Sequence, residues 1–258
     1  MTVSEGASTE QLGLPADYYR RIIEVERSNW WHRGMREIAS AVLGDRLARG
    51  GRLLDAGCGT GGVLAWLRGA GPFGPLAGAD IAGEAIAFAR RQVPDADLRV
   101  APLDAMIFPD ASFDLVVCND VLQHVPSARL GASVSELARV VAPGGALLVR
   151  TGGARHDRSE RDDWRIFSAA GLRAELEAAG LRVARITHAN AAGSLAAAAR
   201  RASPRAPSHE SSGIPVRARS RARDPRFLAL RAEAAWLAGG EARAIPYGHT
   251  ILALATPR

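Results

Sequence analysis

A glycine-rich turn between an apolar run and a helix-compatible segment constrains the fold of this chain more than any other feature. It lies in LLDAGCGTGG, residues 53–62, where two leucines end in the acid Asp55 and glycines follow at Gly57, Gly59, Gly61 and Gly62. Strand, glycine turn and helix in this order bring the backbone of an open α/β sheet close to a ligand. Glycine suits such a turn because it tolerates positive φ and carries no Cβ. The motif therefore predicts a mainly parallel α/β fold.

The acid in this motif discriminates between two classes of ligand. Gly57, Gly59 and Gly62 also satisfy the dinucleotide pattern G-x-G-x-x-G, so the glycines alone are ambiguous. A carboxylate at Asp55 would repel a diphosphate and attract a ligand that carries an ammonium or sulfonium charge. The sequence therefore favours a cationic ligand over a dinucleotide.

Two further acids follow the next two predicted strands. GPLAGAD ends in Asp80, one βα unit after the turn, where a carboxylate can accept hydrogen bonds from both ribose hydroxyls. LRVAPLDA places Asp104 after the third strand, where it can accept from an adenine amino group with the backbone of Ala105 nearby. Three acids at three successive strand ends indicate a site for a nucleoside.

These residues, together with FDLVVCNDVLQHV at 113–125 and ELARVVAPGGALLV at 136–149, resemble the class I S-adenosylmethionine-dependent methyltransferases, and within them the broad small-molecule group. The resemblance covers residues 30–188 and the last strand. It is specific for the cofactor and the fold and unspecific for the substrate. It implies a Rossmann-like, seven-stranded, mainly parallel sheet with helices on both faces, whose seventh strand is antiparallel.

The resemblance also implies which residues bind the cofactor, S-adenosyl-L-methionine. The methionyl end would be cradled by the residues of the turn, namely Asp55, Gly57, Cys58, Gly59 and Gly61. Asp80 would hold the ribose, Ile81 the adenine face, and Asp104 with Ala105 the adenine edge. Cys118 and Asn119 would face the amino-acid part and the sulfonium. Arg33, in the N-terminal arm, would meet the carboxylate of the cofactor.

Alternating strand and helix patterns organise the rest of the chain. Strands are expected at 52–56, 76–80, 97–101, 113–118, 145–151, 181–188 and 249–257, and helices between them at 61–69, 83–92, 127–141 and 168–179. The predicted domains are a tail and helical arm at 1–50, the cofactor-binding core at 51–188, an arginine-rich helical insertion or lid at 189–247, and the final core strand at 248–258. The insertion is expected to hold helices at 191–201 and 227–238.

Charge and cysteine content indicate which partners and which cell compartment are expected for this chain. The chain has no lysine, and residues 200–226 hold eight arginines and two acids, a net charge of +6 that equals the formal net charge of the whole chain. The remainder is therefore neutral. The two cysteines match neither a zinc site nor a disulfide framework, which favours no metal and a cytoplasmic setting. No run of 18 apolar residues is present, so no membrane span is expected.

A histidine supplies the candidate general base. His124 lies directly beyond the fourth strand, at the edge where such sheets bind ligands, and its ordinary pKa suits proton transfer. His156, after the fifth strand, is the alternative. The expected reaction is methyl transfer to O, N or C of a small molecule, in a setting such as secondary metabolism, with the inserted arginines holding an anionic or carrier-linked acceptor.

Two other functions remain open. A nucleic-acid methyltransferase would use the arginine segment, but that segment lacks interleaved aromatic residues, and CNDV stands at 118–121 in place of an Asn-Pro-Pro-Tyr-like motif. Nucleic acid is therefore not the expected partner. A cofactor-binding protein that does not methylate, such as a cyclase or a regulatory partner, is the other alternative.

Overall fold

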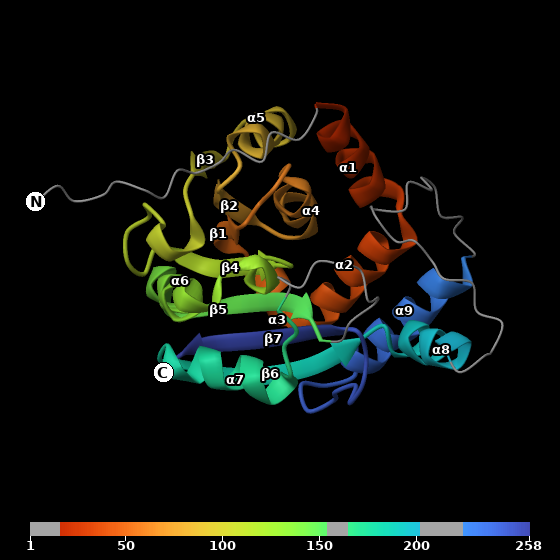
Figure 1. Ribbon diagram of the computed structural model, residues 1–258. Helices are drawn as coiled ribbons and strands as arrows, with labels where there is room; N and C mark the ends of the chain where they lie inside the picture. The colour runs from red at the N-terminus through yellow and green to blue at the C-terminus, as the bar shows by residue number, and fades with distance from the viewer. Residues whose placement is uncertain (1–15, 154–164, 202–223) are drawn as a thin grey trace, which may run out of the picture.

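The computed structural model describes residues 16–153, 165–201 and 224–258 (Figure 1). Within these residues the strands form one seven-stranded sheet in the order β3-β2-β1-β4-β5-β7-β6. The strands are β1 (Gly51–Ala56), β2 (Phe73–Asp80), β3 (Asp97–Val100), β4 (Phe113–Asn119), β5 (Val141–Gly152), β6 (Leu181–Ala189) and β7 (Thr250–Pro257). β7 pairs antiparallel with both β5 and β6, and the other neighbours are parallel. The predicted sheet, including its antiparallel last strand, is confirmed.

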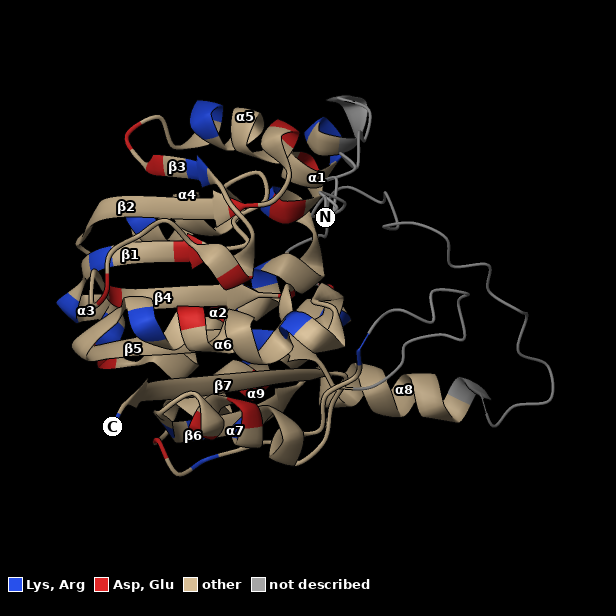
Figure 2. Cartoon of the chain, turned by 60° about the vertical axis from the view of Figure 1, so that its left-hand side comes forward, with Lys and Arg blue, Asp and Glu red and all other residues tan. Residues whose placement is uncertain are grey.

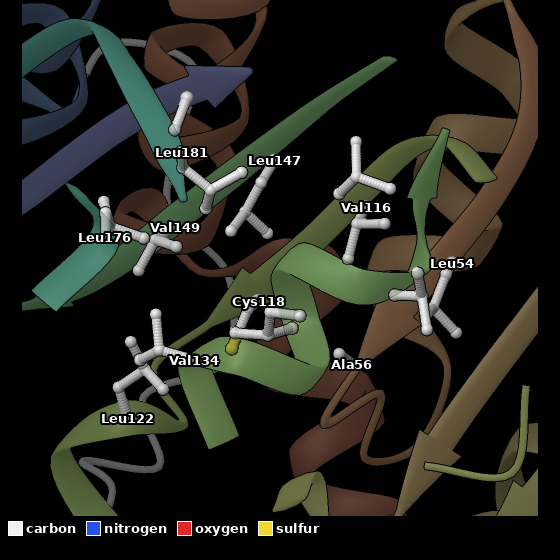
Figure 3. Packing of buried hydrophobic residues seen from close by; sticks show 14 of the residues in the cluster. Leu54, Ala56, Val116, Cys118, Leu122, Val134, Leu147, Val149, Leu176 and Leu181 are labelled. Carbon is white, nitrogen blue, oxygen red and sulfur yellow. The ribbon is translucent and has the colours of Figure 1, made fainter. Parts of the chain in front are cut away.

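Helices cover both faces of this sheet (Figure 1). They are α1 (Ala16–Ser28), α2 (Trp30–Leu43), α3 (Asp45–Arg49), α4 (Gly62–Ala70), α5 (Gly83–Gln92), α6 (Ser127–Val140), α7 (Ala169–Ala178), α8 (Ala191–Arg201) and α9 (Pro225–Ala238), with short 3₁₀ turns η1 (Leu103–Ala105) and η2 (Leu122–His124). Buried side chains of α6 and α7 pack on one face, as Figure 3 shows for Val134 and Leu176, and those of α2, α4, α5 and α9 pack on the other.

The burial pattern of each strand reflects its position in the sheet. The last four residues of β1 are all buried, and so are four consecutive residues of β4, because both strands lie in the middle of the sheet with helices above and below. β6, at one edge, alternates buried and partly or fully exposed residues through LRVARITHA. Acidic residues, red in Figure 2, lie at the ends of β1 and β2 beside the glycine turn, whereas the middle of the sheet carries few charges.

The start of β5 and the packing of the predicted insertion differ from the sequence prediction. β5 starts at Val141, earlier than the predicted 145, because Pro143-Gly144-Gly145 forms an irregularity within the strand. The pairing with β4 shifts register at this point, and Gly144 has a φ of 79°. In the predicted insertion at 189–247, α9 lies against α2 and buries Phe227, Leu230 and Leu237 in the core. This part of the insertion therefore belongs to the body of the domain.

The N-terminal arm contains two adjacent tryptophans, Trp30 and Trp31. Asn29 caps α2 by accepting a hydrogen bond from the backbone N of Trp31 at 2.8 Å. The Trp30 ring contacts the Arg226 guanidinium of α9, and the Trp31 ring contacts the Arg150 guanidinium at the end of β5. The two rings thus connect the arm to separate parts of the domain. None of the helices in the described residues is long and apolar enough to cross a membrane.

Candidate functional site

The glycine turn is held in shape by hydrogen bonds from the second strand. The backbone N–H groups of Gly57 and Cys58 donate to the carbonyl of Ala79 at 2.7 and 2.9 Å. Gly57, Gly59 and Gly61 all have positive φ, between 51° and 85°. A Cβ on Gly57 would come within 2.2 Å of Val121, so this position requires glycine. At Gly59 a Cβ would meet nothing within 4 Å, which indicates open space beside the turn.

A cavity of about 350 Å³ lies beside the turn, at the carboxyl ends of β1, β2 and β4. This is the size range of small-molecule sites in proteins, and this edge of a parallel sheet is where such folds bind ligands. Predicted site residues from four separate segments line this cavity. The lining includes Gly57, Asp80, Ile81, Asp104, Asn119, Asp120, His124 and Arg129. The structure therefore brings six of the predicted residues to one cavity, whereas Asp55, Gly59 and Gly61 do not line it.

Asp55 and Asn119 end two adjacent strands, and each has a buried oxygen without a hydrogen-bond partner. These atoms are Asp55 Oδ2 and Asn119 Oδ1. The Asp55 side chain is 1% exposed, and burial raises its pKa from the usual 3.8 to about 8, with smaller contributions from the carboxyls of Asp80 and Glu26. Two buried acceptors without donors are costly in a folded protein. They fit a cationic or hydrogen-bond-donating group of a ligand.

Asp80 both shapes the turn and faces the cavity. Its Oδ2 accepts from the backbone N–H of Gly59 at 2.8 Å, and its Oδ1 accepts from that of Ala82 at 2.9 Å. Each carboxylate oxygen has a second lone pair, so both can still accept from a pair of hydroxyl groups. Ile81, next to it on the cavity wall, is 54% exposed and offers an apolar surface for a flat ring.

The predicted adenine edge differs in detail from the structure. Asp104 lines the cavity, but both of its carboxylate oxygens accept from the guanidinium of Arg129, on the first turn of α6. Ala105 does not line the cavity, and its backbone N–H donates to the carbonyl of Pro102 at 3.2 Å. The arginine partner was missed because Arg129 lies 25 residues from Asp104 in the sequence.

The two cysteines lie in the core and not in the cavity. Cys118 is completely buried, and its side chain packs near Leu122 and Val134 (Figure 3). The expectation that it faces the sulfonium is therefore wrong: it lies within β4, and its side chain points to the sheet face that α6 covers. Cys58 packs beneath the turn among the residues of the opposite core. Burial raises the pKa of both thiols far above the ordinary range, and neither cysteine forms a disulfide.

Arg33 does not point toward the turn. Its guanidinium lies 4.3 Å from the centre of the Phe227 ring of α9, so its predicted contact with the cofactor carboxylate does not fit this geometry. Arg36 and Arg150 both interact electrostatically with Glu26, which contacts the turn. Arg36 donates to the carbonyl of Glu26 at 2.9 Å, and the Glu26 carboxylate accepts from the Thr60 hydroxyl of the turn at 3.0 Å.

Arg150 connects the arm to the cavity. It forms an ion pair with Asp120, at 2.6 Å between Nη2 and Oδ2, and lies 4.9 Å from the Trp31 ring. Asp120 lines the cavity and has a positive φ of 59°. Burial, reinforced by the charge of Arg150, lowers the pKa of His32 to about 4. The sequence signal for Arg150 is an arginine that follows the apolar run ALLV in β5.

His124 lies in the cavity wall with Asp80 and Asn119, as the sequence predicted for a group near the reacting atoms. It ends η2, and its backbone N–H donates to the carbonyl of Val121 at 2.9 Å. The alternative base, His156, lies outside the described residues. So do Arg217, Arg219, Arg221 and Arg223 of the arginine-rich segment.

Residues 54–149 match a family described as a methyltransferase domain. The chain is 32% identical over 164 residues to a malonyl-[acyl-carrier protein] O-methyltransferase of Enterobacter lignolyticus, which covers 63% of this chain and 60% of the relative. It is 34% identical over 181 residues to a probable S-adenosylmethionine-dependent methyltransferase of Mycolicibacterium smegmatis, covering 66% of each. The chain thus spans less than two thirds of the length of these curated relatives.

Solved structures share the fold at low sequence identity. One is a putative methyltransferase in complex with the Trm112 methyltransferase activator from Haloferax volcanii, with a TM-score of 0.55 and 19% identity over 92% of this chain and 98% of that one. Another is a SAM-dependent methyltransferase from Aquifex aeolicus, with a TM-score of 0.53 and 19% identity over 68% of this chain and 93% of that one. At this identity the likeness supports the arrangement of the sheet and helices.

Proposed function

Because this chain belongs to the class I S-adenosylmethionine-dependent methyltransferases, we propose that it transfers a methyl group from that cofactor to a small-molecule acceptor. One observation of the site supports this proposal most strongly. The buried oxygens Asp55 Oδ2 and Asn119 Oδ1 have no partner, and both lie at strand ends beside the glycine turn. A ligand with an ammonium group would satisfy acceptors of this kind, whereas the diphosphate of a dinucleotide would not.

Residues in the cavity wall, together with the buried Asp55 next to the turn, could each bind one part of this cofactor. Asp55 would accept from its ammonium, Asp80 from the ribose hydroxyls, and Ile81 would cover one face of the adenine. Asp104, already held by Arg129, retains lone pairs for the adenine amino group. When bound, the cofactor supplies an electrophilic methyl group on a sulfonium, so the protein mainly orients the acceptor.

We assign the carboxylate end of the cofactor to the arginines near the turn in place of Arg33. Arg36 and Arg150 both interact electrostatically with Glu26, which contacts the turn through Thr60. Guanidinium groups bind carboxylates through two parallel N–H donors. The ion pair of Arg150 with Asp120 fixes the position of that guanidinium in advance.

We further propose that the acceptor is anionic. Arg165 lies beside the segment that carries His124: its backbone N–H donates to Gln123 O at 3.0 Å, and its Nη2 donates to Ser127 Oγ at 2.7 Å. Its buried Nε has no hydrogen-bond partner, and no carboxylate of the described residues forms an ion pair with it. The curated relative that acts on a carrier-linked malonyl group supports the same acceptor class.

Calorimetry and label transfer test the proposal together. We expect heat on titration with S-adenosylmethionine and S-adenosylhomocysteine and none with NAD, and Asp55→Asn should weaken both interactions. Methyl label should then pass to an acceptor from a panel that includes malonyl thioesters and hydroxyquinones. Binding of NAD but of neither sulfur nucleoside would contradict the proposal. Cofactor binding with conversion of an acceptor but no label transfer would favour the non-methylating alternative.

A further inference from the structure

Gln123 lies between the end of β5 and the candidate base His124. We infer that Gln123 is a positioning residue, whose side-chain amide keeps the His124 imidazole in the tautomer that carries its proton on Nδ1 and its lone pair on Nε2. The tautomer is a property of the folded chain, and its role in catalysis rests on the proposed function.

The orientation of the Gln123 amide follows from its neighbours. Its Oε1 accepts from the backbone N–H of Gly152 at 2.8 Å and lies 3.4 Å from the Thr151 hydroxyl. A backbone N–H can only donate, so the amide atom that faces it must be the oxygen. The NH₂ group therefore points the other way, and its nitrogen lies 3.4 Å from Nε2 of His124.

Hydrogen bonds also fix the backbone around this amide. The Gln123 carbonyl accepts from the backbone N–H of Arg165 at 3.0 Å, and the Gly152 carbonyl accepts from that of Phe167 at 3.1 Å. A Cβ on Gly152 would come within 3.3 Å of the Gln123 oxygen. The absence of a side chain at Gly152 therefore lets the amide lie close to the strand, and turning it over would break its best hydrogen bond.

The contact decides which imidazole nitrogen can act as a base. An amide NH₂ has two donors and no acceptor, so Nε2 of His124 must be the acceptor in this contact. In the neutral ring the single proton is then on Nδ1. During the reaction a proton leaves the acceptor oxygen or nitrogen and bonds to the Nε2 lone pair. The hydrogen bond from the Gln123 amide to Nε2 breaks at this step. The imidazolium that results carries a proton on each nitrogen.

Nitrogen NMR of the full chain measures the tautomer directly. The chain has six histidines, and His124→Asn identifies the signals of His124 by their loss. At a pH above the histidine titration range we expect a pyridine-type ¹⁵N signal for Nε2 and a pyrrole-type signal for Nδ1. Gln123→Met should abolish this preference. Gln123→Glu should reverse it, because a carboxylate in the same place accepts from an Nε2–H.

Gln92→Met is the matched control, since the Gln92 amide donates to the carbonyl of Thr60 and not to a histidine; it should leave the His124 signals unchanged. A pyrrole-type Nε2 signal in the wild-type chain overturns the inference by itself, whatever the variants do. So does an unchanged His124 tautomer in both Gln123 variants. S-adenosylhomocysteine binding, measured in parallel, separates the two claims: a wild-type chain that does not bind contradicts the proposed function and leaves the tautomer result standing.

Discussion

At the scale of single residues, the carboxyl of Asp55 couples ligand binding to pH. Its pKa is raised to about 8 by burial, so in the unliganded chain it is protonated at neutral pH. Binding an ammonium group favours the carboxylate and therefore releases a proton. We expect cofactor affinity to rise about tenfold per pH unit below pH 8 and the titration heat to depend on the buffer. Asp55→Asn should bind more weakly and lose both dependences, as calorimetry in two buffers will show.

The same shift has the opposite effect on the stability of the unliganded chain. A carboxyl whose pKa is higher in the folded state contributes stability at low pH, and this contribution is lost as pH rises from about 4 through about 8. His32 acts in the reverse sense, since its pKa of about 4 costs stability as pH falls below 6.5. A denaturant series on the wild type and Asp55→Asn separates these effects. Similar pH profiles for the two chains would show that Asp55 ionises normally.

Asp80 has two tasks, and its replacement should affect both. Asp80→Ala removes the acceptor of the Gly59 and Ala82 N–H groups as well as the proposed ribose contacts. Losing charge-assisted hydrogen bonds of this kind should weaken cofactor binding by roughly 1.5–3 kcal/mol or more, measured by calorimetry. Asp97→Ala is the control, because that exposed acid forms an ion pair with the exposed Arg99, at the amino end of β3. Equal affinities in both variants would show that Asp80 serves only to shape the turn.

His124 is expected to act on turnover and not on cofactor binding. General-base catalysis contributes about 10²–10⁴ in rate, so His124→Asn should lower kcat by that order while the affinity for S-adenosylhomocysteine changes little. Single-turnover assays with the acceptor found by label transfer measure the first quantity and calorimetry the second. Wild-type turnover in this variant would remove His124 from the mechanism.

At the scale of elements, Arg185 connects β6 to two helices. It is 6% exposed, and its guanidinium donates to the carbonyls of Leu237 in α9, Ala41 in α2 and Arg243. Carbonyls at the end of α9 carry partial negative charge, which offsets the buried cation. Arg185→Met removes these charge-assisted hydrogen bonds and should lower the free energy of unfolding by about 3 kcal/mol. Arg182→Met, on the exposed side of the same strand, should cost less than about 0.5 kcal/mol by urea unfolding.

The elements that the sequence predicted well are those with a local signal. β1, β2 and β4 are mainly apolar runs bounded by polar residues or glycine, and all three overlap their predicted ranges. Asp80 and His124 both line the cavity, because the carboxyl ends of parallel strands meet at one edge. Arg33 and Cys118 were placed wrongly because their surroundings depend on how α9 and α6 pack, which local spacing does not encode. Arg129, Arg150 and Gln123 were missed for the same reason.

At the scale of the whole molecule, charge is unevenly distributed. The net charge of +6 resides in residues 200–226, most of which lie outside the described residues, as do Arg217, Arg219, Arg221 and Arg223. If these arginines attract an anionic acceptor, its KM should rise with salt as the Debye length falls from about 10 Å at 0.1 M to 3 Å at 1 M. Replacing the four with glutamine should abolish that rise in steady-state assays. A quadruple variant with the same KM and salt response would exclude them from acceptor capture.

The antiparallel β7 has a consequence for how this architecture can diversify. β6 ends at Ala189 and β7 begins at Thr250, and these two residues are paired, so the chain leaves and re-enters the sheet at one point on its edge. The entropic cost of closing a loop grows only with the logarithm of its length. Evolution can therefore lengthen or shorten the stretch between α8 and α9 without changing the register of any strand, while α9 keeps its packing on α2. Insertion and deletion there can change the sequence of this excursion and leave the residues at the ends of β1 and β2 as they are.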